Sequence, residues 1–513
     1  IDDWENLSTK DYLKRCKRDV ELNILVWFSQ RNYLTSLYLT EKKILRLINY
    51  LSFKFKCLKE QEENPFTLDI KWAKESINKL RVLIYEKVDL LSKAMPKELG
   101  KTLKKKPKVI YKKDGTLSKH GENWFNLLKS KGLPEDTEII REEPNPLSSN
   151  QLKAWLFELG WKPVTFSDNV KGEKIPQVSL PFGQGLCKSV KDLFENHSIL
   201  KNIESLYMLR HRQSVLVGFL KNQKRRTIHS SAHGFTNTLR LRHAIIQNLP
   251  KVGVPYGEEI RGVLTVSKGY IMIGSDISGL ESGTAQHWIY FFDEDYVNNM
   301  RTEGYDPHID IAVLAELMTK EEEKFYKDFD KGLLEKSENN YKEFKRLKKI
   351  RHTAKTTNFS ATYNASYKKI AETAKISEAE GKKLFDIYWE RNWAIKEVVK
   401  NLKTKEVENQ LWVYNPLSKL WYYVAAEKDL FSTLNQGSGT FVFNNWLMEI
   451  KKISDLKFTF QVHDEICVIF PTKDLEKNKP LFQQAMDRVN QRLKMNVNFS
   501  VSIDVGHNYG ECH

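Results

Sequence analysis

The chain has 513 residues, enough for about three or four domains of ordinary size, and 41% of them are hydrophobic, as in globular proteins with a sizeable core. Lys and Arg number 82 against 66 Asp and Glu, and the formal charge of +16 favours a polyanionic partner, although a lysine-rich solvated surface gives the same excess. No apolar run is long enough to span a membrane, and five scattered cysteines argue against disulfides or a zinc site, so we expect a cytoplasmic protein.

The first part of the chain has a helical pattern. Residues 8–28 predict one helix, and residues 30–95 predict further helices. Residues 97–143 break this pattern, because they are rich in lysine and carry a turn signal at Asp114-Gly115. Such a run is either a solvated face or a surface that binds phosphates, and the sequence leaves both interpretations open.

Two helices and a strand are predicted next. Residues 145–163 predict a helix that begins with a capping box formed by Ser148 and Gln151. Residues 200–228 predict a second, basic helix. An apolar run that ends at Asp276 is typical of a buried strand.

The region after this strand is mostly helical by its pattern. Residues 284–318 are predicted to form a helix. Residues 320–350 are so rich in charged residues that we interpret them as a solvated helical insertion.

Four side chains form a stripe on the helix predicted at residues 351–363. Arg351, Lys355, Phe359 and Tyr363 recur every fourth residue and therefore share one face. Two cations followed by two aromatic rings suit a nucleoside triphosphate, with the cations on its phosphates and the rings against its base and sugar. An amphipathic helix with its basic residues in solvent has the same pattern, so the stripe alone does not establish a site.

Two aspartates give this stripe a chemical context. Asp276 ends its apolar strand, and Asp464 lies in the turn His463-Asp464-Glu465 between two apolar strands of residues 457–470, which predicts a tight hairpin. Each aspartate alone is typical of a turn. Two carboxylates that a fold brings into one cleft could instead hold two Mg²⁺ ions for phosphoryl transfer.

These three stretches resemble the sequence motifs of family A (Pol I-like) DNA polymerases, and especially the phage replicative branch. The first motif matches residues 276–281, the third matches residues 463–465, and the second matches Arg351, Lys355, Asn358, Phe359 and Tyr363. The resemblance implies template-directed synthesis of DNA from deoxynucleoside triphosphates on a primer-template, with two Mg²⁺ ions as cofactors. It also implies a replicative polymerase of a phage, which would work in the cytoplasm of the host cell.

The resemblance implies roles for the residues around the metal ions and the nucleotide. Asp276, Asp464 and the Ile277 carbonyl would hold the metal ions, and Glu465 would assist them. Glu281 would exclude ribonucleotides by packing against the tyrosine of the stripe. The residues that would contact the incoming nucleotide are Arg351, Lys355, Phe359, Tyr363, Glu281 and His308.

Further residues would hold the primer-template. The turn histidine would touch the primer end, and the glutamine of an Asn-Gln-Gly stretch would reach the minor groove. The full set that the resemblance implies is Thr238, Arg240, Gln247, Asn248, Gln436 and His463.

The fold class implied by the resemblance is α+β, in the right-hand polymerase architecture. This architecture has an antiparallel palm sheet and mostly helical thumb and fingers, here preceded by a remnant of a 3′-5′ exonuclease domain. The boundaries we predict are 1–28 for the remnant, 29–203 for the thumb with a basic insertion at 97–143, 204–287 and 405–513 for the palm, and 288–404 for the fingers.

Two partners are suggested outside the polymerase site. Asp19 matches an exonuclease metal ligand, so the rest of that site would lie in a missing N-terminal region or on a separate chain, although a surface acid on a helix looks the same. In some phage relatives an insertion at the place of residues 97–143 recruits a processivity factor, but no motif here names that partner.

Two other classes of protein share parts of this pattern. A single-subunit RNA polymerase has the same palm and both aspartates, but Glu281 and the pair Asn358-Phe359 argue against it. A non-catalytic nucleic-acid-binding protein could keep the fold, but the intact Asp276 and Asp464 argue against that alternative.

Overall fold

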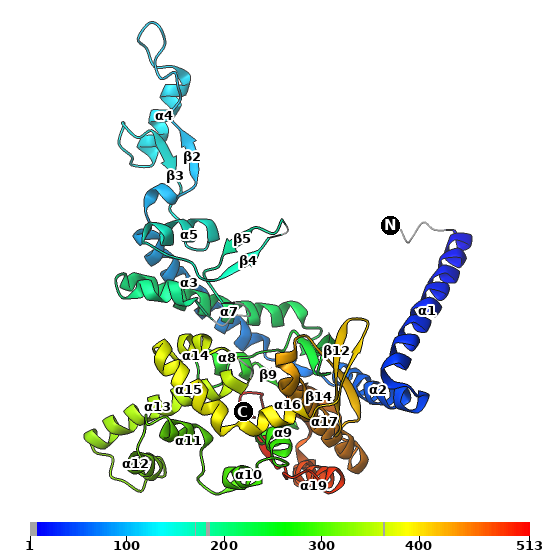
Figure 1. Cartoon of the computed structure of the whole chain (residues 1–513). Coiled ribbons are helices and arrows are strands. Elements are labelled where there is room, and N and C mark those ends of the chain that lie inside the picture. The colour runs from blue at the N-terminus through cyan, green and yellow to red at the C-terminus, as the bar shows by residue number, and fades with distance from the viewer. Residues whose placement is uncertain (1–7, 170, 181–184, 363–364, 513) are drawn as a thin grey trace. The chain divides into compact units, whose positions relative to one another are not determined.

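The computed structural model describes residues 8–169, 171–180, 185–362 and 365–512, and the chain divides into two compact units (Figure 1). The first unit comprises Ile1–Phe66, His229–Asn248 and Val266–His513, and the second comprises Thr67–Ile228 and Leu249–Thr265. Among the described helices, none has both the length and the apolar character needed to cross a membrane.

The first unit consists of helices around a four-stranded sheet. Its helices are α1 (Thr9–Tyr38), α2 (Glu41–Glu63), α9 (Leu280–Ile289), α10 (Glu294–Arg301), α11 (Pro307–Leu314), α12 (Lys320–Asp330), α13 (Glu338–Thr362), α14 (Tyr367–Ala374), α15 (Glu378–Arg391), α16 (Trp393–Lys400), α17 (Leu430–Ile453), α18 (Leu475–Asn478) and α19 (Leu481–Leu493). Its strands are β7 (Ser231–Phe235), β8 (Leu241–Ala244), β10 (Tyr270–Ile277), β11 (Thr404–Val407), β12 (Gln410–Asn415), β13 (Leu420–Val424), β14 (Phe458–Val462), β15 (Glu465–Pro471) and β16 (Val501–Gly506).

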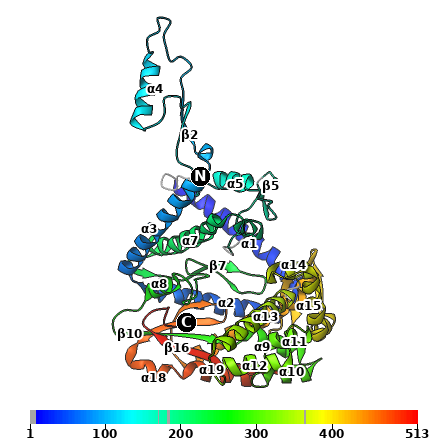
Figure 2. The same ribbon diagram turned by 90° about the vertical axis from the view of Figure 1, so that its left-hand side faces the viewer.

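The central sheet is antiparallel, in the order β14-β15-β10-β16, and Figure 2 shows β10 beside β16. Alternate residues of β10, such as Ile273 and Ile277, are fully buried in a core with Trp446 of α17 and Phe482 of α19. Because successive side chains of a strand point to opposite faces, this apolar set lies on the face that α17 and α19 cover. The hairpin predicted at residues 457–470 is confirmed as β14 and β15.

The C-terminal segment passes over the other face of β10. A Cβ atom at Gly274 would lie 2.7 Å from the carbonyl oxygen of Cys512, so only glycine allows this approach without a shift of the backbone. Asp276 follows Gly274 by two residues and therefore lies on the same face of the sheet. The register pairs Asp276 with Glu465 on β15 and with Ser502 on β16.

The prediction of one helix at residues 284–318 is wrong, because this region belongs to α9, α10 and α11. Asp293 and Asp306 start new helices, since their side chains accept hydrogen bonds from the backbone N–H groups of Tyr296 and of His308. Proline at the first position of α11 strengthens the second of these starts. Charged caps inside an apolar pattern therefore divide the predicted helix.

The region 320–350 is mostly helical, as expected, but it is not a wholly solvated insertion. Its second half belongs to α13, which continues without interruption to Thr362. Tyr326, Phe329 and Phe344 are buried, and the rings of Tyr326 and Phe344 stack with centroids 4.9 Å apart. The charged residues cover the outer face of two amphipathic helices, whereas their apolar residues build a core.

The second unit is centred on α3 (Ile70–Ala94) and α7 (Lys201–Asn222), whose residues Leu91, Ile203 and Leu206 share one core. The predicted boundary at residue 203 falls inside this packed pair. The other elements of this unit are α4 (Lys119–Ser130), α5 (Ser149–Glu158), α6 (Lys188–Lys191), α8 (Gly257–Gly262), β2 (Thr102–Lys105), β3 (Ile139–Arg141), β4 (Phe166–Asp168), β5 (Lys174–Pro176), β6 (Thr227–Ile228) and β9 (Leu264–Thr265). Strand β1 (Phe66–Leu68) begins with the last residue of the first unit's N-terminal segment and continues into the second unit.

The predicted capping box of α5 forms only in part. The Ser148 hydroxyl accepts a hydrogen bond from the Gln151 N–H, as expected. The Gln151 side chain instead accepts a hydrogen bond from the Asn145 N–H, three residues before Ser148. The helix start was therefore predictable from sequence, but the partner of the glutamine was not.

Residues 97–143 form a small structure of their own within the second unit, drawn in cyan in Figure 1. Strands β2 and β3 pair with each other, and α4 packs its residues Trp124 and Leu128 against Ile140 of β3. These three side chains are almost completely buried. The lysines of this segment therefore lie on a folded body.

Candidate functional site

Asp276 and Asp464 meet at one end of the four-stranded sheet. Asp276 lies near the end of β10, and Asp464 lies in the turn between β14 and β15. Because β10 and β15 are antiparallel neighbours, the end of β10 is beside the start of β15, and the Ile277 N–H donates a hydrogen bond to the Asp464 carbonyl oxygen at 3.1 Å. The structure thus brings together the two carboxylates that the sequence singled out.

Both carboxylates are costly to ionise in the folded chain. Burial, together with the nearby Asp464 carboxylate, raises the pKa of Asp276 to about 6. Burial also raises the pKa of Asp464, and the Glu281 carboxylate acts in the same direction. The Oδ1 atom of Asp276 is buried without a hydrogen-bond partner. Two close carboxylates with an unpaired oxygen are stabilised by a hard divalent cation, so this donor set fits Mg²⁺.

The remaining ligands of such a cation would come from outside these two side chains. The described residues contain no group of three or more His, Cys, Asp or Glu side chains that could hold a metal ion. Mg²⁺ is commonly bound by one or two carboxylates together with water and substrate phosphates. The carbonyl of Ile277, which the resemblance implies as a ligand, belongs to the residue directly after Asp276.

Glu465 is turned toward the C-terminal segment. Its carboxylate is buried and accepts hydrogen bonds from the Tyr509 hydroxyl at 3.2 Å and from the Cys467 thiol at 3.5 Å. Burial raises the pKa of the Cys512 thiol to about 12, and Glu465 contributes to that rise, so the two side chains are close. The structure therefore gives Glu465 partners in the interior, and its help to the metal ions stays a prediction.

A cavity of about 380 Å³ adjoins Asp464. Glu281, at the start of α9, lines it together with His308 of α11 and Phe359 of α13. The cavity therefore joins the sheet end that carries the carboxylates to the helices that carry the predicted nucleotide-binding residues. Its volume is in the range of pockets for small ligands.

The predicted stripe lies on α13. The helix predicted at residues 351–363 is confirmed over 351–362, as the last part of α13 (Glu338–Thr362). The Nζ atom of Lys355 lies 5.8 Å from the centre of the Phe359 ring. Phe359 is half exposed at the cavity. Tyr363, the fourth member of the stripe, lies outside the described residues, and so does its predicted contact with Glu281.

Arg351 is held by a carboxylate that the sequence did not single out. Its Nε and terminal nitrogen atoms both lie 2.6 Å from Oδ2 of Asp306, while Oδ1 of Asp306 caps α11. Although burial opposes it, the hydrogen bonds from Arg351 and from the His308 N–H lower the pKa of Asp306. Asp306 therefore ties the start of α11 to α13, and it could only have been found through its place beside His308 in the sequence.

Two asparagines that were not assigned a role also line the cavity. The Nδ2 atom of Asn358 lies 3.0 Å from Nδ1 of His308, and Nδ2 of Asn435 donates to the Glu281 carbonyl oxygen at 3.0 Å. Each asparagine has a buried Oδ1 atom without a hydrogen-bond partner. Both belong to stretches that match the family motifs, and this match is the sequence signal that could have identified them.

A second set of predicted residues gathers around His463. This residue has a left-handed backbone, with φ of 53°, at the hairpin turn. Burial and the nearby Arg240 guanidinium lower the pKa of His463, whereas Asp464 and Glu281 oppose that change. Arg240 and His463 line one small cavity together with the buried Lys54. Arg240 and His463, both predicted to contact DNA, are therefore brought together.

Lys54 is a residue of this cluster that the sequence did not suggest. It lies on α2, is 3% exposed, and donates a hydrogen bond to Oδ1 of Asn444 at 3.1 Å. Burial lowers the pKa of Lys54 to about 7. No pattern in sequence marks such a lysine, because α2 carries many lysines that are exposed.

The other residues predicted to contact DNA are placed differently from one another. Thr238 is buried, and its hydroxyl lies 3.0 Å from that of Thr236 in the loop between β7 and β8. Gln247 and Asn248 are exposed just after β8, and Gln436 is half-buried on α17.

Asp19 is an exposed residue on α1. Within the described part of the chain it belongs to no cluster of carboxylates that could hold a metal ion. Its assignment to an exonuclease site stays a prediction.

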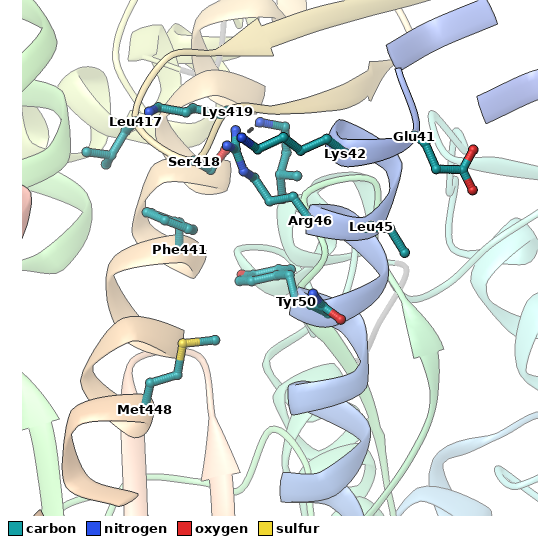
Figure 3. Close-up of a pocket in the computed structure, with 12 residues that line it drawn as sticks. Glu41, Lys42, Leu45, Arg46, Tyr50, Leu417, Ser418, Lys419, Phe441 and Met448 are labelled. Atoms are coloured by element: carbon teal, nitrogen blue, oxygen red, sulfur yellow. Dashed lines mark hydrogen bonds between the residues drawn. The ribbon is translucent and has the colours of Figure 1, made fainter. Parts of the chain in front are cut away.

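A larger cavity of about 780 Å³ lies elsewhere in the first unit, between α2, α17 and the turn from β12 to β13. Figure 3 shows Lys42 and Arg46 of α2 directed toward the turn that carries Lys419, with Phe441 of α17 nearby. None of the residues predicted to be functional lines it. Size alone therefore does not identify the site, and the carboxylate pair does.

Comparison with known protein families places a match in the second half of the chain. The family described as DNA polymerase family A matches residues 308–511, which include α11 from its second residue, α13 and the hairpin with Asp464. Among solved structures, the polymerase domain of Pol1 from M. smegmatis, in complex with DNA primer-template and dNTP, is similar in fold. Its TM-score is 0.60 at 16% sequence identity, covering 89% of this chain and 70% of that one.

Relatives of known sequence extend the similarity over most of the chain. The DNA-directed DNA polymerase of Enterobacteria phage T3 is 23% identical over 520 aligned positions, covering 89% of this chain and 68% of the relative. The DNA-directed DNA polymerase of Escherichia phage T7 is 22% identical, with the same coverage. DNA polymerase I of Helicobacter pylori is 25% identical over a shorter stretch, covering 48% of this chain and 25% of that enzyme.

Proposed function

We propose that the chain is a DNA polymerase of family A, similar to those of phages T3 and T7, and that it extends the 3′ end of a primer on a DNA template from deoxynucleoside triphosphates. The observation that carries this proposal is the meeting of Asp276 and Asp464 beside the cavity of α11 and α13. As a replicative polymerase of a phage, it would act in the host cytoplasm.

In the proposed reaction the two aspartates hold two Mg²⁺ ions, with the Ile277 carbonyl as a further ligand. When bound, these ions supply the positive charge that phosphoryl transfer requires at the attacking and leaving oxygens. The raised pKa values of Asp276 and Asp464 and the unpaired Oδ1 of Asp276 support this assignment.

The helices of the cavity bind the incoming nucleotide in this proposal. Arg351 and Lys355 neutralise its phosphates, since catalysis of phosphoryl transfer depends on positioning and charge. Phe359 packs against its sugar, and Glu281 excludes a 2′-hydroxyl. The half-exposed Phe359 ring and the place of Glu281 in the same cavity support these roles.

The primer-template lies beside the cluster of Arg240 and His463 in this proposal, with His463 at the primer end. The proximity of Arg240 to both His463 and Asp464 supports it, because a guanidinium there can bind a primer phosphate. Thr238, Gln247 and Gln436 are proposed as further contacts of the DNA.

We assign the sheet with α17 and α19 to the palm, the helices α11 to α16 to the fingers, and the second unit to the thumb. The antiparallel sheet that carries both aspartates supports the first assignment. The packing of α7 with α3 supports a thumb that extends past residue 203.

Two partner proposals remain from the sequence. Residues 97–143 bind DNA phosphates, directly or with a processivity factor, and their folded core with exposed lysines supports this. A 3′-5′ exonuclease activity, if it acts with this polymerase, is supplied by a region or chain beyond the described residues, with Asp19 as its remnant.

Primer extension with Mg²⁺ tests the proposed function. The purified chain is given a labelled primer-template with deoxynucleoside or ribonucleoside triphosphates, one nucleotide type at a time. Template-directed addition of deoxynucleotides is the expected result. A preference for ribonucleotides would favour the RNA polymerase alternative, and binding of DNA without any extension would favour the non-catalytic one.

A further inference from the structure

We propose that Asn358 is a positioning residue that holds His308 as a neutral imidazole with its proton on Nε2, so that this nitrogen donates a hydrogen bond to the triphosphate of the incoming nucleotide. This inference rests on the proposed function, because it names how one residue of that site is oriented. Asn358 acts through His308 and does not itself touch the reacting atoms.

The orientation of the Asn358 amide follows from a backbone carbonyl. Its Nδ2 atom donates a hydrogen bond to the carbonyl oxygen of Pro307 at 3.1 Å. A carbonyl oxygen can only accept, so the amide cannot be flipped without placing two acceptors against each other. The NH₂ group, and not the oxygen, therefore faces Pro307.

The same NH₂ group determines which nitrogen of His308 carries the proton. Nδ2 of Asn358 lies 3.0 Å from Nδ1 of His308, and an amide NH₂ is a donor only. Nδ1 must therefore accept, and in a neutral imidazole the proton is then on Nε2. His308 lines the cavity with Phe359, the two ring centres being 6.0 Å apart, so a ligand in the cavity can contact the imidazole ring.

The surroundings of His308 keep the ring neutral. Burial lowers the pKa of His308 to about 4, and Arg351 and Lys355 of α13 lower it as well, whereas Asp306 opposes them. The other carboxylates that line or adjoin this cavity are Glu281 and Asp464, on the side of the sheet. The ring thus adds a directed donor beside Arg351 and Lys355, and its lowered pKa favours the neutral imidazole at neutral pH.

If Asn358 had only a structural role, its Oδ1 atom would also be expected to have a hydrogen-bond partner. The Oδ1 atom of Asn358 is buried and has no hydrogen-bond partner. A buried acceptor without a partner is destabilising, and an apolar side chain of similar volume would avoid that loss. The amide is therefore explained by its donor side, which serves Pro307 and His308.

Two substitutions separate the positioning role from a packing role. Asn358→Leu keeps the volume but removes the donor, so we expect the KM for deoxynucleoside triphosphates to rise about tenfold with little change in kcat, as for a lost hydrogen bond to a charged group. Asn358→Asp places an acceptor at Nδ1, which draws the proton to that nitrogen and raises the pKa of His308. In this variant KM should fall as the pH decreases from 9 to 6, whereas the wild-type KM shows no such dependence on His308.

The controls use residues of the same helix and a double-mutant cycle. Thr357→Val changes a fully buried residue whose hydroxyl binds only its own helix, so KM should stay unchanged. In a His308→Ala background, Asn358→Leu should add nothing to the increase in KM. Thermal melting of each variant checks that the fold is kept, and Asn358→Asp carries the test alone if the leucine variant unfolds.

Two results would overturn the inference. One is an equal effect of Asn358→Leu with and without His308, which would make Asn358 a packing residue. The other is a pH profile of Asn358→Asp that matches the wild type. Both are read in an assay where the wild-type chain extends the primer, so a failure of the proposed function would be seen separately, as no extension at all.

Discussion

Asp276 illustrates how a single residue can favour function over stability. Its pKa is raised from the usual 3.8 to about 6, mainly by burial and then by Asp464. The folded chain therefore binds this proton more tightly than the unfolded chain. The resulting contribution to stability is fully present below pH 4 and is lost as the pH rises through 6. At neutral pH without metal ions, the pair should destabilise the fold that holds it.

Asp276→Asn should separate the two effects. We expect synthesis to fall by about three orders of magnitude or more, because a metal ligand is lost, while binding of primer-template changes little. The same variant should melt at a higher temperature than the wild type at pH 7.5 in EDTA, and this gain should vanish near pH 4. Asp504→Asn, which alters an exposed carboxylate on β16, is the control. Robust extension by Asp276→Asn would refute the assignment of the site.

Phe359 should make the enzyme discriminate against dideoxynucleotides. A normal nucleotide has a 3′-hydroxyl that can hydrogen-bond to its own phosphate, and a phenyl ring offers no replacement when that hydroxyl is missing. An unfilled polar position costs about 1–3 kcal/mol, or roughly tenfold to a few hundredfold in selectivity. Phe359→Tyr should therefore raise dideoxynucleotide incorporation strongly with little effect on normal nucleotides. Equal termination by wild type and variant at matched ratios would show that Phe359 does not face the sugar.

At the residue scale, side chains that repeat at helical spacing can be predicted from the sequence, whereas contacts between residues far apart in the chain cannot. Arg351, Lys355 and Phe359 were placed on one face because a helix repeats about every four residues. The ion pair of Arg351 with Asp306 and the contact of Asn358 with His308 span a gap of some fifty residues and depend on how α11 packs on α13. No local pattern encodes that packing.

At the scale of elements, the hairpin could be predicted from local sequence, whereas the ends of the helices could not. β14 and β15 were predictable, because two apolar runs flank a polar turn and pair with each other. The division of residues 284–318 into three helices was not predictable, because Asp293 and Asp306 act as helix caps only where the chain turns. The apolar residues of α12 are few among many charged ones, but their helical spacing puts them on one face, and that face packs in the core.

Phe344→Ala should therefore weaken the helices that carry the stripe. The side chain is buried and stacks on Tyr326, so its removal should cost about 3–5 kcal/mol in local stability. Amide hydrogen exchange in α12 and α13 measures this loss, and KM for nucleotides should rise because Arg351 lies on the same helix. Tyr341→Ala, at an exposed site of α13, is the matched control and should have little effect. Equal exchange in both variants would show that the packing of Phe344 does not stabilise α12 and α13.

At the scale of the whole molecule, the residues proposed to act in catalysis and in DNA binding are distributed unequally between the two units. Both aspartates, the cavity and the stripe belong to the first unit, whereas the basic segment 97–143 belongs to the second. The charge of +16 suggested a polyanionic partner but could not say where it binds. The folded core of Trp124, Leu128 and Ile140 now makes the segment a defined body whose lysines can be tested without disrupting the site.

Lys105, Lys112 and Lys113 are exposed on this segment, and their joint replacement by glutamine should shorten the products made per binding event. Each phosphate contact that is lost should flatten the dependence of log K on log salt by up to about 0.9. Insertion of a single nucleotide at low salt should remain as in the wild type, because the site in the first unit is unchanged. Lys473, Lys477 and Lys479 are exposed lysines outside the segment, and their replacement removes the same charge as a matched control.

Primer extension with a trap for released enzyme measures product length across a salt series. If the control triple variant shortens the products equally, net charge and not residues 97–143 governs processivity; if single-nucleotide insertion collapses instead, the segment supports the catalytic site.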